Sequence, residues 1–188
     1  MKRSRLFFAL LCVVLLTGCC VNYNLDSDVN PWIGFSTFGK DAFSGAYRWN
    51  GDSHNMQIVI PDEYKDFPVT RLGGYYGSGV PSPFDIVLPS EYCNKSIWSS
   101  PPEDTLSREQ YKLQELVFDL YLGKNVKELE LVLSNYYAYQ HEDGTYTFTH
   151  PVFNVECSPE NKTFYSESGK LYFLKSGELA ELPYPSQS

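Results

Sequence analysis

Short apolar runs that end at a proline or glycine recur along this chain and restrict the folds open to it. Ile58-Val59-Ile60-Pro61 and Ile86-Val87-Leu88-Pro89 share one form. Later runs are variants of this form, often with a Val-x-x-Leu step: Val69-Thr70-Arg71-Leu72-Gly73, Leu113-Gln114-Glu115-Leu116, Leu120-Tyr121-Leu122-Gly123 and Val126-Lys127-Glu128-Leu129. Proline cannot donate to a strand ladder, so it forces the chain out of a sheet. Because one such unit cannot bury its own apolar face, we expect several units to stack around a continuous core.

Within each run the apolar residues lie two positions apart, which is the period of a strand with one buried face. The residues expected to point inward are Ile58, Ile60, Ile86, Leu88, Leu120, Leu122, Phe153 and Val155. The opposite parity then points outward and, in stacked units, lines up as one exposed ladder. Its members are Gln57, Val59, Asp85, Val87, Asp119, Tyr121, Val152 and Asn154. We interpret this ladder as a candidate binding face with Tyr121 at its centre.

Turn signals between the runs predict local elements. Asn50-Gly51-Asp52 separates two strand-like segments, 46–49 and 56–60, and predicts an opening hairpin. Residues 134–150 predict a second hairpin around Asp143-Gly144. A short helix is expected over 104–110, because Ser107 and Gln110 have the spacing of a capping box.

The composition favours a β-dominated globular domain, since aromatic residues make up 16% of the chain and half of them are tyrosine. Aromatic rings near turns suit recognition of proteins or sugars, although we expect most of them to fill the core. The formal charge is −8, and loss of three N-terminal cations leaves −11. This acidic balance argues against nucleic acid as a partner and against electrostatic adhesion to anionic lipid.

The first residues have the layout of an export signal. Lys2, Arg3 and Arg5 precede an apolar stretch, 6–16, that is too short to span a bilayer as a helix. Leu16-Thr17-Gly18-Cys19 then resembles the lipobox of bacterial lipoproteins, which implies cleavage before Cys19 and a lipid on its thiol. We therefore expect residues 1–18 to be a signal peptide. Residues 19–31 would be the lipidated cysteine with a flexible tether, and 32–188 one domain. The lipid on Cys19 makes a membrane the expected partner and places the domain outside the cytoplasm.

Three cysteines remain if Cys12 leaves with the signal and Cys19 carries a lipid: Cys20, Cys93 and Cys157. Cys93 and Cys157 are the pair to consider for a disulfide, but free buried thiols are at least as consistent with the sequence.

Motifs of catalysis are missing from the sequence. His54, His141 and His150 have no zinc-ligand spacing, and no nucleophile elbow, P-loop or dinucleotide fingerprint is present. We therefore expect no catalytic residues, no metal and no cofactor, and interpret the chain as a protein that is not an enzyme.

The C-terminal segment carries the most specific pattern. Asn161-x-x-Phe164-x-Ser166-x-x-Gly169-x-Leu171-Tyr172 follows a strand-like run and resembles the closing segment of BspA-type leucine-rich repeat proteins. This resemblance spans about residues 56–182. It implies a short, irregular leucine-rich-repeat-like solenoid with terminal β-hairpins and one short helix. It also implies a surface protein with a non-catalytic binding or adhesion role toward an unknown protein or glycan ligand. The alternatives are an extracytoplasmic glycan hydrolase and a structural subunit of an envelope complex.

Overall fold

The structure is a computed structural model that describes residues 24–25, 33–75, 81–82, 84–130 and 135–186. These residues are rich in β-strand and contain almost no helix, as the sequence predicts. Helical structure among them is limited to two 3-10 segments, η2 (Ser53–Asn55) and η3 (Pro102–Asp104). The export signal, Cys19 and most of the proposed tether lie outside the described residues.

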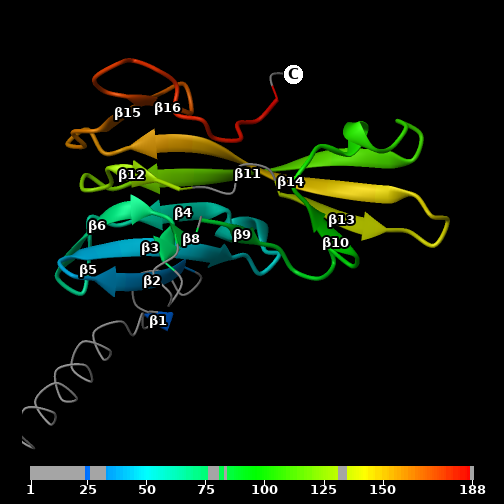
Figure 1. The fold of residues 1–188 in the computed structure, drawn as a ribbon, viewed down its shortest axis with the longest axis horizontal. Helices are drawn as coiled ribbons and strands as arrows, with labels where there is room; N and C mark the ends of the chain where they lie inside the picture. Colours follow the sequence, from blue (N-terminus) through cyan, green and yellow to red (C-terminus); the bar gives the residue numbers. More distant parts are fainter. Residues whose placement is uncertain (1–23, 26–32, 76–80, 83, 131–134, 187–188) are drawn as a thin grey trace, which may run out of the picture.

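The first sheet has the order β1-β2-β3-β6-β12, with β5 pairing to β6 and β9 to β3. Its strands are β1 (Asn24–Leu25), β2 (Ile33–Phe38), β3 (Asp41–Arg48), β5 (Glu63–Tyr64), β6 (Phe67–Leu72), β9 (Ile86–Val87) and β12 (Glu128–Leu129). The neighbours β3, β6 and β12 run parallel to one another. These strands lie in the lower and middle levels of Figure 1.

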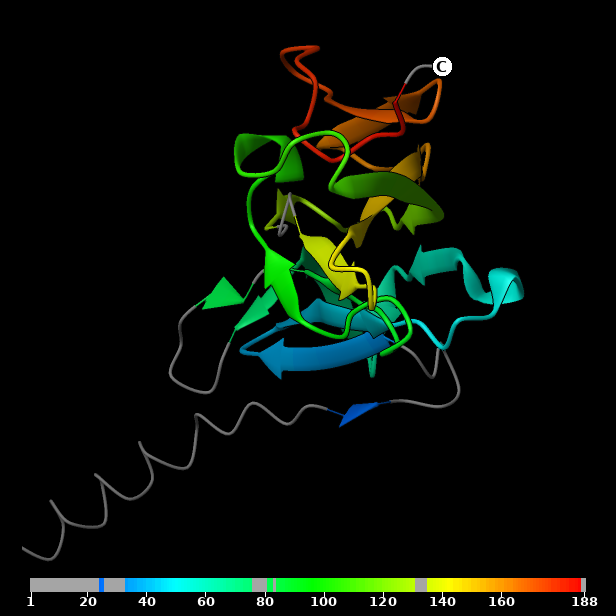
Figure 2. The ribbon, with the colours of Figure 1, turned by 90° about the vertical axis from the view of Figure 1, so that its right-hand side faces the viewer.

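The second sheet has the order β10-β13-β14-β11-β4. Its strands are β4 (Gln57–Ile60), β10 (Ser96–Trp98), β11 (Tyr111–Leu122), β13 (Tyr136–Gln140) and β14 (Tyr146–Cys157). Two small hairpins complete the fold: β7 (Gly74–Tyr75) with β8 (Pro81–Ser82), and β15 (Phe164–Glu167) with β16 (Lys170–Phe173). Figure 2 shows the blue β2 and β3 at the bottom and the orange β15 and β16 at the top.

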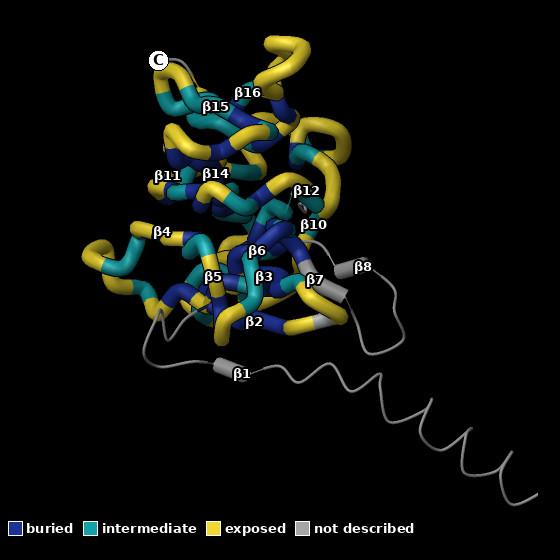
Figure 3. The backbone as a smooth tube through the Cα atoms, turned by 90° about the vertical axis from the view of Figure 1, so that its left-hand side faces the viewer, coloured by how far each residue is buried: buried dark blue, intermediate teal, exposed yellow. Residues whose placement is uncertain are grey.

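One apolar core joins the two sheets. Leu72 and Val69 of the first sheet belong to the same buried cluster as Ile58 and Leu120 of the second. Rings also meet across the sheets, since Phe118 on β11 lies 6.3 Å from Tyr47 and 5.7 Å from Trp49 between ring centroids. Buried segments gather where the sheets meet, and exposed turns lie at the periphery (Figure 3).

Three parallel strands in register form the part of the second sheet that matters for the site. We call this set, made of β4, residues 119–122 of β11 and residues 154–157 of β14, the parallel ladder. Its four rungs are Gln57–Asp119–Asn154, Ile58–Leu120–Val155, Val59–Tyr121–Glu156 and Ile60–Leu122–Cys157. Four residues predicted to point inward from its strands, Ile58, Ile60, Leu120 and Leu122, are buried, as are Phe153, Val155, Ile86 and Leu88. The predicted parity of these strands is confirmed.

The opening hairpin predicted around Asn50-Gly51-Asp52 is wrong. The strands on either side of the turn belong to different sheets, because β4 pairs with β11 and not with β3. The turn instead leads into η2, and the Trp49 indole N–H donates to the carbonyl of Asp52 at 2.8 Å. A parallel partner distant in sequence buries both Ile58 and Ile60, and this outweighs the local turn signal.

The helix predicted over 104–110 is also absent. Ser107 and Gln110 do contact each other, since the Ser107 N–H donates to Gln110 Oε1 at 2.9 Å. The contact closes one turn, after which Tyr111 begins β11 and the Gln110 carbonyl accepts from the N–H of Tyr146. The contact between Ser107 and Gln110 that is typical of a helix start is therefore present, but no helix follows, because the chain from Tyr111 onward pairs in the second sheet.

The hairpin predicted around Asp143-Gly144 is confirmed, with β13 and β14 antiparallel on either side of the turn. The closing segment forms a second hairpin, β15–β16, whose turn residues Ser168 and Gly169 both have positive φ. Ser166 Oγ accepts from the N–H of Cys157 at 3.0 Å, which attaches this hairpin to the end of β14. Cys93 and Cys157 are both free thiols, so they form no disulfide with each other.

Candidate functional site

The first and third of the four rungs carry the outward-facing side chains of the parallel ladder, and most of these side chains are polar. Gln57, Asp119 and Asn154 occupy one rung, and Val59, Tyr121 and Glu156 occupy the next outward-facing rung. All of these residues are exposed except Tyr121, which is half-buried. The strands alternate their side chains, so the burial of Ile58, Leu120 and Val155 between the two rungs forces these six residues outward.

A hollow of about 300 Å³ lies on this face. Its lining includes the side chains of Gln57, Asp119, Tyr121, Asn154 and Glu156, together with Gly169. Asn154 Nδ2 donates to Asp119 Oδ1 at 3.3 Å, so two neighbouring strands fix these side chains against each other. The hollow therefore joins four of the residues predicted for the binding face with two, Glu156 and Gly169, that were not predicted for it.

Gly169 brings the β15–β16 hairpin close to the ladder. Its carbonyl accepts from the N–H of Val155 at 2.7 Å, and its φ of 74° belongs to the left-handed region that favours glycine. A Cβ at this position would lie 3.3 Å from Asn154 Oδ1. The hairpin thus forms one wall of the hollow without displacing Asn154.

Asp85 and Val87 do not belong to the ladder, and this part of the predicted face is wrong. Asp85 precedes β9 and Val87 is its last residue. This strand pairs with β3 in the first sheet through Tyr47–Ile86 and Arg48–Val87. Val87 is exposed there, away from the ladder strands. The Ile-Val-Leu-Pro run has the parity that was predicted but a different neighbour. It pairs with the end of β3, beyond the stretch that pairs with β6, where the N–H groups of Tyr47 and Trp49 donate to the carbonyls of Asp85 and Val87.

Asp85 instead takes part in a polar cluster between the sheets. Its carboxylate accepts from Asn135 Nδ2 at 3.1 Å and from the Tyr137 hydroxyl at 3.5 Å, and that hydroxyl also donates to the Ile86 carbonyl. Burial raises the pKa values of Asp85 and Tyr137. Since these contacts connect β13 to the segment around β9, the cluster holds the two sheets together.

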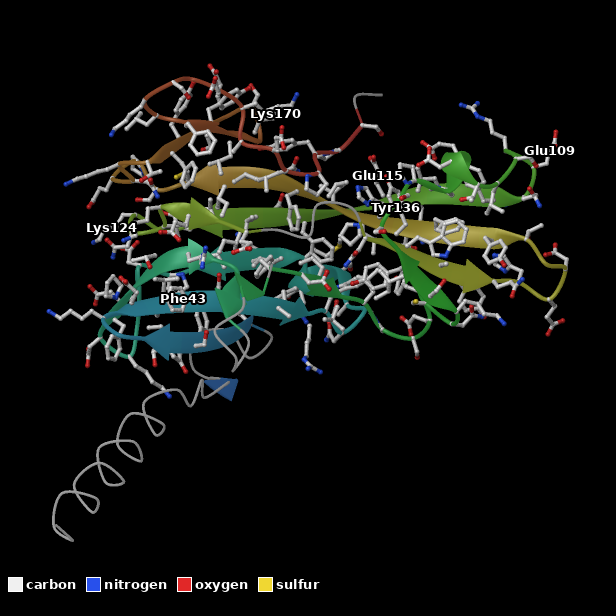
Figure 4. All side chains as sticks on the ribbon, in the orientation of Figure 1. Phe43, Glu109, Glu115, Lys124, Tyr136 and Lys170 are labelled. Atoms are coloured by element: carbon white, nitrogen blue, oxygen red, sulfur yellow. The ribbon has the colours of Figure 1, made fainter. Side chains whose placement is uncertain are left out.

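Val152 is fully buried, so its predicted exposure is also wrong. The C-terminal segment leaves the edge of β14, where the Pro183 carbonyl accepts from the N–H of Phe153. It reaches Glu115 on β11, whose Oε2 accepts from the Ser186 N–H at 2.9 Å (Figure 4). To do so it crosses the outward face at the level of Val152, which ends the open part of the ladder at Asn154.

Two lining residues were missed by the sequence reasoning. Glu156 lies two positions after Asn154 on the same strand and therefore points to the same side. Continuing the alternation by one more outward position would have found it. Gly169 belongs to the closing motif, and no local signal places its hairpin beside Asn154.

Within the described ranges, no group of three or more His, Cys, Asp or Glu side chains is arranged to hold a metal ion. No helix in the same ranges is long and apolar enough to span a bilayer. No protein-family model matches the chain, and neither a curated protein nor a solved structure does.

Proposed function

We propose that this chain is a lipid-anchored extracytoplasmic surface protein whose non-catalytic binding face is the outward side of the parallel ladder. The observation that carries the proposal is the register of β4, β11 and β14. It lines up Gln57, Asp119 and Asn154 beside Tyr121 and Glu156 around one hollow. The anchor would be a lipid on Cys19, which the Leu16-Thr17-Gly18-Cys19 pattern supports.

The proposal includes a short leucine-rich-repeat-like solenoid of the BspA type. Two sets of parallel strands support this part of the proposal: the parallel ladder itself and the set β3-β6-β12 of the first sheet. The turns that follow the ladder strands stack on one another. The turn after β4 contacts the turn after β11 through Asp62, whose carbonyl accepts from Asn125 Nδ2 at 2.9 Å. The turn after β14 continues the stack, since Asn161 Nδ2 donates to the carbonyls of Gly123 and Val126 at 2.9 Å each. Each unit thus satisfies polar groups of its neighbour, which is the arrangement that stacked repeats need.

A binding role fits the hollow better than hydrolysis does. Glycoside hydrolases raise the pKa of their general acid by placing it in an apolar pocket. Asp119 and Glu156 are instead both exposed on an open sheet face. A glycoside hydrolase of that kind would need a more enclosed site than this hollow offers.

The test is a binding screen with the mature lipoprotein in detergent against immobilised extracellular proteins and a glycan array. Any ligand found is then measured with Asp119→Asn and with Glu142→Gln, a control carboxylate exposed near the tip of the β13–β14 hairpin. We expect Asp119→Asn to weaken binding and Glu142→Gln to leave it unchanged. A ligand that binds both variants as tightly as the unmodified protein would show that the ladder is not the binding face.

A further inference from the structure

We propose that the hollow on the parallel ladder binds one uncharged sugar residue of a glycan. This inference rests on the proposed function and goes further by naming the class of ligand. It follows from the chemistry of the lining side chains, their freedom to accept a partner, and the size of the hollow.

The lining combines two carboxylates, two primary amides and one phenol, and none of its described residues is Lys, Arg or His. Carboxylates accept hydrogen bonds, whereas amides and phenols both donate and accept. Sugar hydroxyls also donate and accept, so an uncharged sugar ring can satisfy all three kinds of group. An anionic ligand, such as a phosphate or a uronic acid, would meet Asp119 and Glu156 with no cation in the lining to offset their charge.

Two of these polar groups are positioned but have no partner. Among the described residues, the side chains of Gln57 and Glu156 have no hydrogen-bond partner, while Asn154 and Asp119 hold each other at 3.3 Å. All four residues lie on paired strands, which fixes the spacing of their Cα atoms before a ligand arrives. The ordering cost of binding therefore falls mainly on Gln57 and Glu156 and is smaller for the paired Asn154 and Asp119.

Apolar surface lies on the second outward-facing rung. Tyr121 is half-buried, and its neighbour on the rung, Val59, exposes 40% of its surface. A sugar ring has apolar C–H faces in addition to its hydroxyls, and an aromatic ring offers a flat surface for such a face. Tyr121 lines the hollow and Val59 lies beside it, so polar and apolar contacts are both offered within one small area.

The volume of about 300 Å³ lies at the lower end of the range for small-molecule sites. It suits one ring rather than a folded partner, with the rest of a glycan extending over the sheet. Single-site affinity is expected to be weak. Many lipid-anchored copies on one membrane would raise the avidity, since neighbouring copies act at high effective concentration.

The test is calorimetry on the mature lipoprotein in detergent, at low and high salt. Methyl glycosides of glucose, galactose, mannose and N-acetylglucosamine are the neutral probes, glucuronate is the anionic probe and hexalysine the cationic probe. We expect at least one neutral glycoside to bind with little salt dependence, because screening acts only on charged ligands. Glu156→Gln and Asn154→Ala should each weaken it about tenfold or more, and Glu142→Gln should not.

The outcomes separate this inference from the proposed function. Salt-sensitive binding of hexalysine alone, lost in Glu156→Gln, would overturn the sugar and keep the ladder as the binding face. Glycoside binding that the ladder variants do not change would overturn both. Failure of every neutral glycoside, alongside a protein ligand that Asp119→Asn weakens, would overturn the inference and support the proposed function.

Discussion

Asp62 holds Lys124 through both oxygens of its carboxylate. Oδ1 accepts from the backbone N–H of Lys124 at 2.7 Å, and Oδ2 lies 3.3 Å from Lys124 Nζ. The side-chain contact raises the pKa of Lys124, which lies at the end of β11 (Figure 4). Because Asp62 follows β4 and Lys124 follows β11, this pair aligns two strands of the parallel ladder.

The two contacts predict different effects of substitution. Asp62→Ala removes the acceptor of a backbone N–H and should lower the free energy of unfolding by about 1 kcal/mol. Lys124→Met keeps the backbone contact and loses only an exposed ion pair, so it should change stability little. Urea denaturation of both variants measures the difference. Equal losses in the two variants would mean that the ion pair, not the backbone contact, aligns the turns.

Gly123 should be intolerant of a side chain because two turns approach closely there. A Cβ at this position would lie 2.8 Å from both the Pro61 carbonyl oxygen and Asp62 Oδ1. Gly123→Ala should therefore destabilise the fold by about 1–3 kcal/mol through overpacking. Gly177→Ala is the comparison. That position has nothing within 4 Å of a Cβ, so its alanine variant loses only the stability that its positive φ costs a residue with a side chain. If Gly123→Ala unfolds at the same urea concentration as the unmodified protein, the turns are not closely packed in solution.

Neighbouring residues on β11 should separate stability from binding. Leu122 is fully buried, so Leu122→Ala should cost about 2–5 kcal/mol through the cavity it leaves. Tyr121→Ala should stay within about 1 kcal/mol of the unmodified protein, because its ring faces outward, and should weaken any ligand of the hollow. Thermal unfolding and calorimetry give the two quantities. A large loss of stability with Tyr121→Ala would assign that ring to packing.

His150 should make stability depend on pH. Its imidazole is stacked on Tyr136 with ring centroids 4.4 Å apart, and burial lowers its pKa below 6.5 despite the opposing effects of the Asn135 carbonyl and the Glu115 charge. A lowered pKa in the folded state favours the neutral form, so this contribution is present above pH 6.5 and is lost as pH falls through the lower folded value. His150→Gln should flatten the decline in unfolding free energy between about pH 7 and pH 5. A His150→Gln protein with the same decline as the unmodified protein would show that this imidazole does not cause the pH dependence.

The anchor is tested at Cys19. Cys19→Ser should abolish labelling of the protein by radioactive palmitate and move it from membrane to soluble fractions, because the lipid is attached through that thiol. Cys20→Ser is the matched control and should label normally. Continued labelling of Cys19→Ser would rule out the proposed attachment site.

The buried faces of the ladder strands can be predicted from the amino-acid sequence alone. Alternation at Ile58/Ile60 and Leu120/Leu122 is a local property of a strand, so a single stretch of sequence suffices to orient it. Asp143-Gly144 likewise determined a hairpin, because its two strands are neighbours in the chain. The exposed face of Gln57, Asp119 and Asn154 follows from the same local alternation, which requires no knowledge of the neighbouring strands.

Which strands lie side by side depends instead on the tertiary fold. The Ile86 run has the same pattern as the Ile58 run, but it pairs with β3 and removes Asp85 and Val87 from the ladder. The C-terminal segment covers Val152, and the β15–β16 hairpin brings Gly169 to the hollow. Such pairings join residues far apart in the chain, and they depend on which arrangement buries the most apolar surface while satisfying the strand edges. Local periodicity has no access to that comparison, since it describes one strand at a time.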